Sequence, residues 1–384
     1  MAENQIRVMR VIARMNVGGP AIQISGLARN LDHERFDQRI YAGICDADER
    51  DYAKEVAKDV VIHHVPGLSQ SINPIKDLRA SFYLIRQIRA FEPDIIHTHT
   101  FKAGFVGRIA ALMSFKDVKI VHTFHGHILH GYFSPAVNKF IIAIERYLAK
   151  KSDVLIAVGE VVRDDLLSAR IGYPEQYQIV PPGLVFNSSK SKAEARAELD
   201  LKPKDKVISF IGRITKIKRV DRFLDVVELL QKSEANLKVL IAGEGDLFPQ
   251  MKEIAKQRDL SIQWLGWVDD VEPIIQASDL VVLTSDNEGT PISLIQAALA
   301  GVPVVATDVG SVSDVVLDRV TGVLCELDSR VIARAVEELL LNSSLRENLG
   351  LAARINAQKV YGVNRLAKDH EEIYSLITAD EDTF

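Results

Sequence analysis

The 384-residue sequence predicts an α/β protein that consists of two doubly wound domains. Three observations lead to this fold class. Short apolar runs alternate with stretches of helical periodicity, which is typical of βαβ units and a parallel sheet. The apolar runs are rich in β-branched residues and barely alternate, as expected of strands that are covered on both faces. The alternation also pauses once, over the polar stretch Phe186–Lys206, and then starts again.

The first series of apolar runs predicts six strands, which are Ile6–Ala13, Gln38–Ile44, Val60–His64, Asp94–Thr98, Lys119–Phe124 and Asp153–Val158. Amphipathic stretches between them, such as Ile75–Phe91 and Pro135–Lys150, predict helices. The turn residues Pro181-Pro182-Gly183 close this first sheet. The second series predicts five strands, which are Lys206–Ile211, Lys238–Ala242, Ser261–Leu265, Asp279–Leu283 and Val302–Ala306.

We therefore predict an N-terminal domain over residues 1–184 and a C-terminal domain over residues 200–360. Residues 361–384 contain a further predicted helix, Asn364–Ile377, for which we expect a return to the first domain. In doubly wound sheets, ligands bind outside the carboxyl ends of the strands. The cleft between the two domains is therefore the expected binding site.

Composition narrows the class of protein. A hydrophobic fraction of 47% allows each domain to bury a core and excludes a disordered chain. Two cysteines, Cys45 and Cys325, exclude a disulfide framework and a cysteine-based zinc cluster. We see no transmembrane segment and no secretory signal, so we expect a cytoplasmic protein. The net charge of −5 is uneven, because residues 1–184 hold 23 Lys and Arg against 20 Asp and Glu.

Three segments combine turn residues with groups that bind anions. The first, Asn16-Val17-Gly18-Gly19-Pro20, follows the first strand and opens a helix over Ala21–Leu31. Paired glycines let a ligand approach the backbone, and a helix N-terminus offers free N–H groups to an anion. A tight turn without a ligand is the alternative interpretation.

The second segment, Phe210–Arg219, leaves a strand and carries four cations within seven residues. Arg213 and Lys218 can both reach a phosphate at the carboxyl edge of the second sheet, and arginine offers bidentate geometry. A solvated charged face is the alternative interpretation.

The third segment, Asp286–Gln296, gives the strongest prediction of a site. Gly289 and Pro291 place a sharp turn before a helix, so the backbone N–H groups that follow can face a phosphate. Glu288 offers an acceptor for ligand hydroxyls, and Gln296 lies two helical turns further along roughly the same face. A capped helix with polar surface residues is the alternative.

Taken in order, these motifs resemble those of the family 4 retaining glycosyltransferases of GT-B fold. The resemblance rests on Gly18-Gly19, on His122-Thr123-Phe124-His125-Gly126, on Gly212-Arg213 with Lys218, on Gly243-Glu244-Gly245, on Glu288-Gly289 with Gln296, and on Gly301–Asp308 with Gly322. It spans the chain from Arg7 to about Leu366. It implies the GT-B arrangement, in which two Rossmann-like domains face each other across a cleft.

The resemblance implies catalytic roles for four residues. His125 would contact the transferred sugar near its reacting end, and Glu288 would hold sugar hydroxyls. Arg213 and Lys218 would neutralise the leaving diphosphate. The residues implied to bind the donor, through phosphate, ribose or base, are Gly18, Gly19, Gly289, Thr290, Pro291, Ile292, Gln296, Gly266 and Val268.

The sequence departs from the family pattern at two positions. Gln296 stands where the family usually has Glu, so its hydrogen bond to the ribose loses charge assistance and the donor affinity is expected to fall. Arg219 stands where many relatives have Gly, and it adds a positive charge at the phosphate edge.

The resemblance predicts a retaining glycosyltransferase that moves a sugar from a nucleotide-diphosphate donor, a UDP-sugar, to a hydroxyl of a glycan or lipid-linked acceptor. Cations and amides aimed at the departing diphosphate lower the barrier to such a transfer. The donor is a co-substrate, and we expect neither a metal cofactor nor a nucleic-acid partner. Two alternatives stay open, which are a nucleotide-sugar epimerase of GT-B fold and a non-catalytic nucleotide-sugar-binding protein.

Two segments, one rich in histidine and one with two aspartates, suggest a metal site as a competing interpretation. Six histidines lie between His97 and His130, but Asp117 is the only acidic residue between Phe101 and Val137, so carboxylates that orient metal-bound histidines are scarce there. The other segment, Asp46-Ala47-Asp48, is expected to be a solvated turn.

A basic amphipathic stretch suggests a contact with the membrane surface. Arg79, Arg86 and Arg89 share a predicted helix with Phe82 and Ile85, and such helices can lie on anionic lipid. Packing in the core is the alternative interpretation. Peripheral contact of the N-terminal domain with the inner face of the membrane is therefore a hypothesis for a cytoplasmic enzyme.

Overall fold

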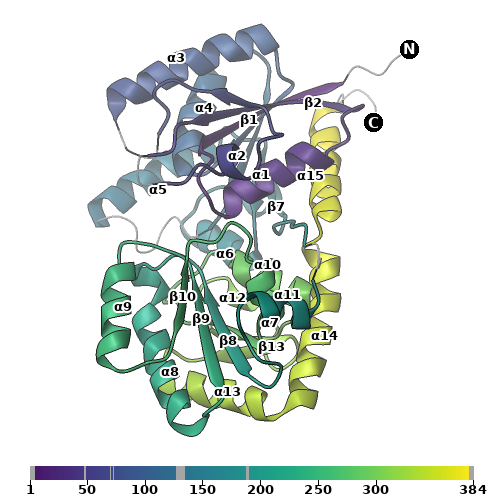
Figure 1. Ribbon diagram of the computed structural model, residues 1–384. Coiled ribbons are helices and arrows are strands. Elements are labelled where there is room, and N and C mark those ends of the chain that lie inside the picture. Colours follow the sequence, from purple (N-terminus) through teal and green to yellow (C-terminus); the bar gives the residue numbers. More distant parts are fainter. Residues whose placement is uncertain are drawn as a thin grey trace. The chain divides into compact units, whose positions relative to one another are not determined.

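A computed structural model of the chain describes residues 5–46, 49–69, 71, 73–126, 135–186 and 190–379. The chain divides into two units. The first comprises Met1–Leu184 with Gly362–Phe384, and the second comprises Val185–Tyr361. Each unit is a parallel sheet with helices on both faces (Figure 1).

The first unit contains a seven-stranded sheet in the order β3-β2-β1-β4-β5-β6-β7, with every strand pair parallel. Its strands are β1 (Ile6–Arg14), β2 (Phe36–Gly43), β3 (Ile62–His64), β4 (Ile95–His99), β5 (Lys119–Phe124), β6 (Val154–Ala157) and β7 (Tyr177–Ile179). The order reverses at β1, which is the mark of a doubly wound sheet. The carboxyl ends of β1, β4 and β5 therefore share one edge.

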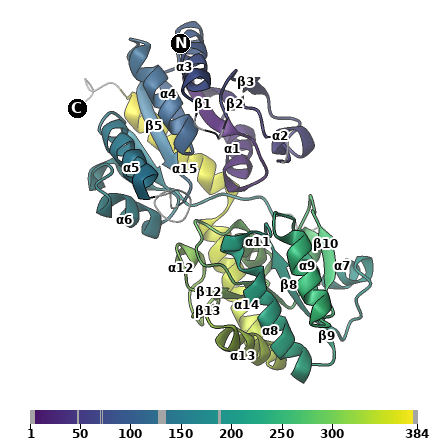
Figure 2. The same ribbon diagram turned by 90° about the vertical axis from the view of Figure 1, so that its left-hand side faces the viewer.

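Helices cover both faces of this first sheet. They are α1 (Gly19–Asn30), α2 (Tyr52–Glu55), α3 (Pro74–Phe91), α4 (Phe101–Met113), α5 (Pro135–Ala149), α6 (Glu160–Ser168) and α15 (Val363–Thr378). One face packs against Leu84 of α3 and Val106 of α4. The other face packs against Leu27 of α1 and Tyr374 of α15, so the last helix of the chain completes the core of the first unit (Figure 2).

The second unit contains a six-stranded parallel sheet in the order β10-β9-β8-β11-β12-β13. Its strands are β8 (Lys206–Ile211), β9 (Leu237–Ala242), β10 (Gln263–Gly266), β11 (Leu280–Leu283), β12 (Val304–Thr307) and β13 (Gly322–Cys325). Its helices are α7 (Lys192–Glu198), α8 (Val220–Ser233), α9 (Phe248–Gln257), α10 (Glu272–Ala277), α11 (Ile292–Ala300), α12 (Val312–Val315), α13 (Ser329–Leu341) and α14 (Ser343–Val360). Its largest core contains Phe223 of α8, Leu339 of α13 and Val239 of β9.

The structure confirms the predicted fold class. Each of the eleven predicted strands is present within a few residues of its expected bounds, and the predicted helices Ile75–Phe91, Pro135–Lys150 and Asn364–Ile377 correspond to α3, α5 and α15. Sequence reasoning missed β7 and β13. Both are edge strands of three or four residues, too short to give a recognisable apolar run. No helix in the described ranges has both the length and the apolar character needed to span a bilayer.

Candidate functional site

The loops after β8 and β9 pack backbone on backbone in the second unit. Gly243 has a φ of +133°, and a Cβ there would stand 2.0 Å from the carbonyl oxygen of Gly212. The N–H of Gly212 donates to the carbonyl oxygen of Ala242 (3.0 Å). These contacts fix the backbone from which Arg213 extends. Arg213 is exposed, and its guanidinium makes no hydrogen bond or ion pair with the residues that the structure describes.

Lys218 and Glu288 form an ion pair at the edge where β8 and β11 end. Lys218 Nζ lies 2.6 Å from Glu288 Oε1, and the hydroxyl of Ser285 donates to the same oxygen (2.5 Å). The Glu288 side chain is only 8% exposed. The sequence analysis predicted both as site residues but did not predict that they form an ion pair. The adjacency of β8 and β11 in a doubly wound sheet was the available signal.

Arg219 is held by carboxylates of its own unit. Its backbone is left-handed (φ 49°), and its guanidinium donates to Asp221 and to Asp286. The hydrogen bond to Asp221, followed by that to Asp286, raises the pKa of Arg219. Arg222 also donates to Asp286. The extra charge that Arg219 brings is therefore balanced locally.

The turn before α11 exposes backbone donors. The N–H groups of Gly289, Thr290, Ile292 and Ser293 find no hydrogen-bond acceptor within the described part of the chain. The hydroxyl of Thr290 is buried and also has no partner there. Pro291 precedes the helix as its N-cap. The turn thus gathers unsatisfied donors at a helix N-terminus, where an anion is favoured.

The loop after β12 packs against this turn. Ser311 N–H donates to the carbonyl oxygen of Glu288 (3.0 Å). Gly310 has a φ of +53°, and a Cβ there would stand 2.0 Å from the Glu288 carbonyl oxygen. Only glycine fits between these two loops without displacing the backbone of Glu288.

The remaining predicted donor-binding residues of the second unit lie on the same strand edge or on α11. Gly266 ends β10 with a φ of +64°, and its carbonyl oxygen accepts the N–H of Gly243 (2.7 Å). Val268 follows two residues later and is partly buried. Gln296 lies on α11, is partly buried, and its amide has no hydrogen-bond partner among the described residues.

In the first unit, the predicted glycines follow β1. Gly18 is the N-cap of α1, and Gly19 is its first residue. The strand that enters this turn is anchored by Tyr52, whose N–H donates to the carbonyl oxygen of Met15 (2.8 Å). A Cβ at Gly18 would meet only the ring of Pro20, at 3.9 Å, so the turn is open on that side.

His125 follows β5 and lies beside a second histidine. Its Nε2 is 3.0 Å from Nδ1 of His99, which ends β4. Burial lowers the pKa of His125 to about 3, so its imidazole is neutral at pH 7. The burial of His97, His99 and His122 likewise lowers their pKa values well below the usual range.

The histidines of β4 and β5 form hydrogen bonds with hydroxyls or with His125. His97 lies between Tyr374 and Thr123, and His122 pairs with Thr98. Within the described residues, no group of three or more His, Cys, Asp or Glu side chains is arranged to hold a metal ion. Further residues of the proposed metal segments, which are Ala47, Asp48, His127 and His130, lie outside the described residues.

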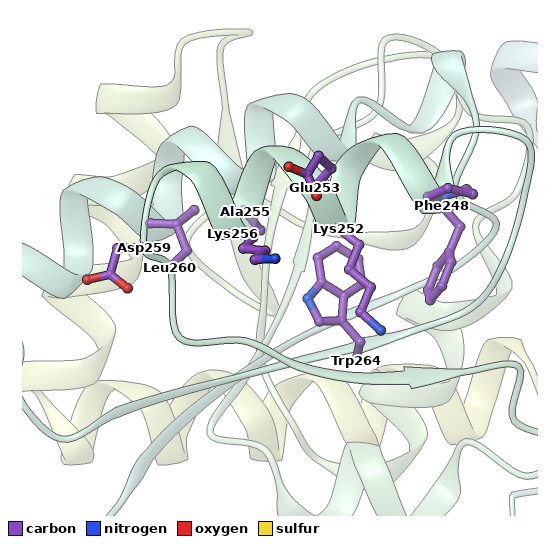
Figure 3. Close-up of a pocket in the computed structure, with 9 residues that line it drawn as sticks. Phe248, Lys252, Glu253, Ala255, Lys256, Asp259, Leu260 and Trp264 are labelled. Atoms are coloured by element: carbon purple, nitrogen blue, oxygen red, sulfur yellow. The ribbon is translucent and has the colours of Figure 1, made fainter.

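A surface hollow of about 690 Å³ occurs elsewhere in the second unit (Figure 3). It lies between α9 and β10, and Lys252 and Phe248 of α9 face Trp264 of β10. None of the predicted site residues lines it. The predicted anion-binding groups lie instead at the carboxyl edge of the strands, which offers an exposed guanidinium, an ammonium and free N–H groups. That set of groups suits a diphosphate.

Comparison with known proteins identifies the family of the chain. A family model described as Glycosyltransferase Family 4 matches residues 17–186, and one described as Glycosyl transferases group 1 matches residues 191–356. The chain is 27% identical over 298 residues to the N-acetyl-alpha-D-glucosaminyl L-malate synthase of Bacillus anthracis, covering 75% of this chain and 76% of that protein. It is 26% identical over 293 residues to the UDP-Gal:alpha-D-GlcNAc-diphosphoundecaprenol alpha-1,3-galactosyltransferase of Escherichia coli, covering 72% and 75%.

Solved structures share the fold. Anabaena HepE in complex with UDP and glucose superposes with a TM-score of 0.82 at 19% sequence identity, covering 97% of this chain and all of that one. The two doubly wound sheets are therefore those of the GT-B fold. The matched motifs, the family models and the fold agree, and the chain belongs to the family 4 glycosyltransferases.

Proposed function

We propose that this glycosyltransferase moves a sugar from a UDP-sugar to a hydroxyl of a glycan or lipid-linked acceptor, with retention of configuration at the transferred carbon. The names of similar proteins support the donor and acceptor classes, since one uses UDP-Gal on a diphosphoundecaprenol-linked sugar and HepE was solved with UDP and glucose. The observation that carries the proposal is the set of unsatisfied donors before α11, next to Lys218 and Glu288.

The second unit would hold the donor. Arg213, Lys218 and the N–H groups of Gly289, Thr290 and Ile292 bind the diphosphate, and Gln296 accepts hydrogen bonds from the ribose hydroxyls. Backbone from Gly266 to Val268 contacts the base. The first unit would hold the acceptor, with the Gly18-Gly19 turn facing the diphosphate and His125 facing the transferred sugar.

The Lys218–Glu288 pair would act on both halves of the donor. Glu288 Oε1 is occupied by Lys218 and Ser285, which leaves its second oxygen for a sugar hydroxyl. In the transfer, the bond from the sugar carbon to the diphosphate oxygen breaks and a bond to the acceptor oxygen forms. The acceptor's proton passes to the departing phosphate oxygen. Lys218 and the free N–H groups stabilise the charge that develops there, so this proposed step needs no metal ion.

Thermal-shift measurements with a panel of nucleotide sugars test the donor class, and a transfer assay with the best ligand tests the reaction. Lys218→Ala is expected to lower kcat/KM about 100-fold, because one preorganised cation at the leaving group is worth that order of rate. Lys216→Ala removes an exposed lysine from the same loop and is expected to keep normal transfer. Unchanged transfer by Lys218→Ala would refute the proposed site.

The same assays separate the alternatives. An epimerase would convert the donor sugar in the absence of an acceptor, and it needs an acid and a base at the sugar. A non-catalytic binding protein would show the thermal shift but would release no nucleotide in the presence of acceptors. Release of nucleotide in proportion to glycosylated product supports the transferase.

We also propose peripheral contact of the first unit with the inner face of the membrane, through the exposed face of α3. Ile75, Leu78 and Phe82 are 83%, 56% and 55% exposed on that face. Arg79 and Arg86 are exposed beside them. The only acidic residue of α3, Asp77, is buried in an ion pair with Lys102 on α4. An apolar stripe with basic neighbours suits anionic lipid.

Vesicle co-sedimentation tests this contact. We expect binding to phosphatidylglycerol vesicles, weak binding to phosphatidylcholine vesicles, and loss of binding in Phe82→Ser. Equal sedimentation of Phe82→Ser and the unchanged protein would show that α3 is not the contact.

A further inference from the structure

A chain of buried polar side chains crosses the first unit behind His125. Arg10 on β1 donates to the hydroxyl of Tyr374 on α15 (3.3 Å). That hydroxyl is 2.6 Å from Nδ1 of His97, and Nε2 of His97 is 2.7 Å from the hydroxyl of Thr123. Arginine can only donate, so the phenol oxygen accepts from Arg10. Among the described residues, His97 Nδ1 is the one acceptor within reach of the buried phenol hydrogen, so the phenol donates to His97 Nδ1. His97 therefore carries its proton on Nε2.

His97 in turn supports His99. The two rings lie 4.1 Å apart between centroids, and both side chains are fully enclosed. His97 has both nitrogens engaged, so its ring cannot turn without losing a hydrogen bond. The fixed ring of His97 therefore limits the movement of the His99 ring that packs against it. Nδ1 of His99 lies 3.0 Å from Nε2 of His125.

The two neutral imidazoles share one proton in that contact. Either His99 donates from Nδ1 to His125, or it accepts there and carries its proton on Nε2. Nε2 of His99 is buried and has no partner in the described part of the chain. The second arrangement would bury an orphaned N–H group, and the first leaves only an orphaned lone pair. Buried donors without an acceptor are the rarer of the two in proteins.

We infer that His99 is a positioning residue, which donates from Nδ1 to Nε2 of His125 and so fixes the proton of His125 on Nδ1. The hydrogen bond made by one ring nitrogen decides which tautomer the other presents. His125 would then offer an N–H donor from Nδ1, which forms no hydrogen bond with the described residues. This inference rests on the proposed function, in which that donor meets an oxygen of the transferred sugar.

The assignment limits the chemistry of His125. An imidazole that presents Nδ1–H to the sugar donates a hydrogen bond and cannot take a proton at that nitrogen. His125 would therefore orient the sugar and stabilise charge on its oxygen. The acceptor's proton is left to the departing phosphate oxygen, in agreement with the transfer proposed above.

Nitrogen NMR of the full-length protein tests the tautomer directly. Long-range proton–nitrogen spectra at pH 7.5, assigned through His125→Gln, should show His125 protonated on Nδ1. His99→Leu removes the donor and should shift His125 to the Nε2–H form. His99→Asn keeps an amide donor near the position of Nδ1 and should keep the Nδ1–H form. A wild-type His125 with its proton on Nε2 would overturn the inference.

Two further variants make the test robust. His99→Gln keeps the size of the side chain but carries its amide near the position of Nε2, so it repeats the loss if His99→Leu does not fold. His122→Leu removes an equally buried histidine that has no hydrogen bond to His125 and is the matched control. An unchanged His125 spectrum in both His99→Leu and His99→Gln would equally overturn the inference.

Kinetics link the tautomer to transfer. Loss of one positioned hydrogen bond in His99→Leu should lower kcat about tenfold, with a smaller change in the donor KM and recovery in His99→Asn. A merely structural role would instead lower kcat equally in His99→Asn and in His99→Leu. Absence of transfer by the wild-type protein with every nucleotide sugar would refute the proposed function but leave the tautomer result intact.

Discussion

At the scale of single residues, the Lys218–Glu288 pair determines how much charge the second unit offers to an anion. Glu288 is nearly enclosed and holds Lys218 at 2.6 Å, so this pair contributes no net charge. Arg219 is likewise balanced by Asp221 and Asp286. Arg213 therefore remains as an exposed guanidinium without a carboxylate partner among the described residues. In the proposed complex, a diphosphate would share Lys218 with Glu288, so donor binding would be coupled to the position of that carboxylate.

A substitution at Gln296 tests the departure from the family pattern. Gln296→Glu restores a charged acceptor on α11 for the ribose hydroxyls, and a charged hydrogen bond is stronger than a neutral one by roughly 1 kcal/mol. We expect UDP to bind about fivefold more tightly to Gln296→Glu in isothermal titration calorimetry. Gln296→Ala, which removes both acceptor and donor, should bind UDP more weakly than the unchanged protein. Unchanged UDP affinity in Gln296→Ala would show that the side chain does not contact the nucleotide.

At the scale of elements, the proposed anion site depends on loops whose backbones pack directly on one another. Gly310, in the loop after β12, packs against the turn before α11. Gly243, in the loop after β9, packs in the same way against the loop after β8. In both pairs a glycine faces a carbonyl oxygen at a distance that no Cβ could occupy. The positions of Glu288 and Arg213 are therefore set by neighbouring loops as well as by their own strands.

Gly310→Ala is expected to damage both stability and binding. A Cβ would add left-handed strain and would push the carbonyl of Glu288 away, at a cost on the order of 3 kcal/mol. Gly301→Ala is the matched control, since its φ is +76° but its nearest neighbouring atom lies 3.6 Å from a Cβ. Urea unfolding should show a loss of about 1 kcal/mol for Gly301→Ala, with normal UDP affinity. Equal losses of UDP affinity in both variants would contradict this account of the loop.

At the scale of the whole molecule, the sequence was sufficient to predict the class and order of the fold. Apolar runs mark buried parallel strands well, so the two sheets and most helices could be predicted. Edge strands such as β7 and β13 could not, because three or four residues carry no periodicity. The motifs also led to the prediction that Lys218 and Glu288 are site residues. The adjacency of β8 and β11 brings these two residues to one sheet edge. Their ion pair, and the contact of His99 with His125, also depend on side-chain directions that residue order does not encode.

The distribution of histidines predicts that acid weakens one unit first. All ten histidines belong to the first unit, and both tryptophans, Trp264 and Trp267, belong to the second. Burial lowers the pKa of His370 to about 3 from an ordinary value of 6.5. Between these values the unfolded chain binds a proton that the folded chain does not, so stability falls as the pH falls through this window. At pH 5 this histidine alone lowers the free energy of unfolding by on the order of 2 kcal/mol.

The carboxylates of the second unit respond at lower pH. The pKa of Asp279 is lowered from its ordinary value of 3.8: desolvation by burial, the largest single effect, would raise it, but Lys192 and other partners together outweigh that effect. Stability from this aspartate is therefore lost only as the pH falls below about 4. Between pH 7 and pH 5, the melting temperature measured by circular dichroism, which follows both units, should fall strongly. Tryptophan fluorescence, which follows the second unit, should shift less. His370→Asn cannot titrate in this range and should shrink the circular-dichroism shift, whereas an equal shift in both signals would contradict the assignment to the first unit.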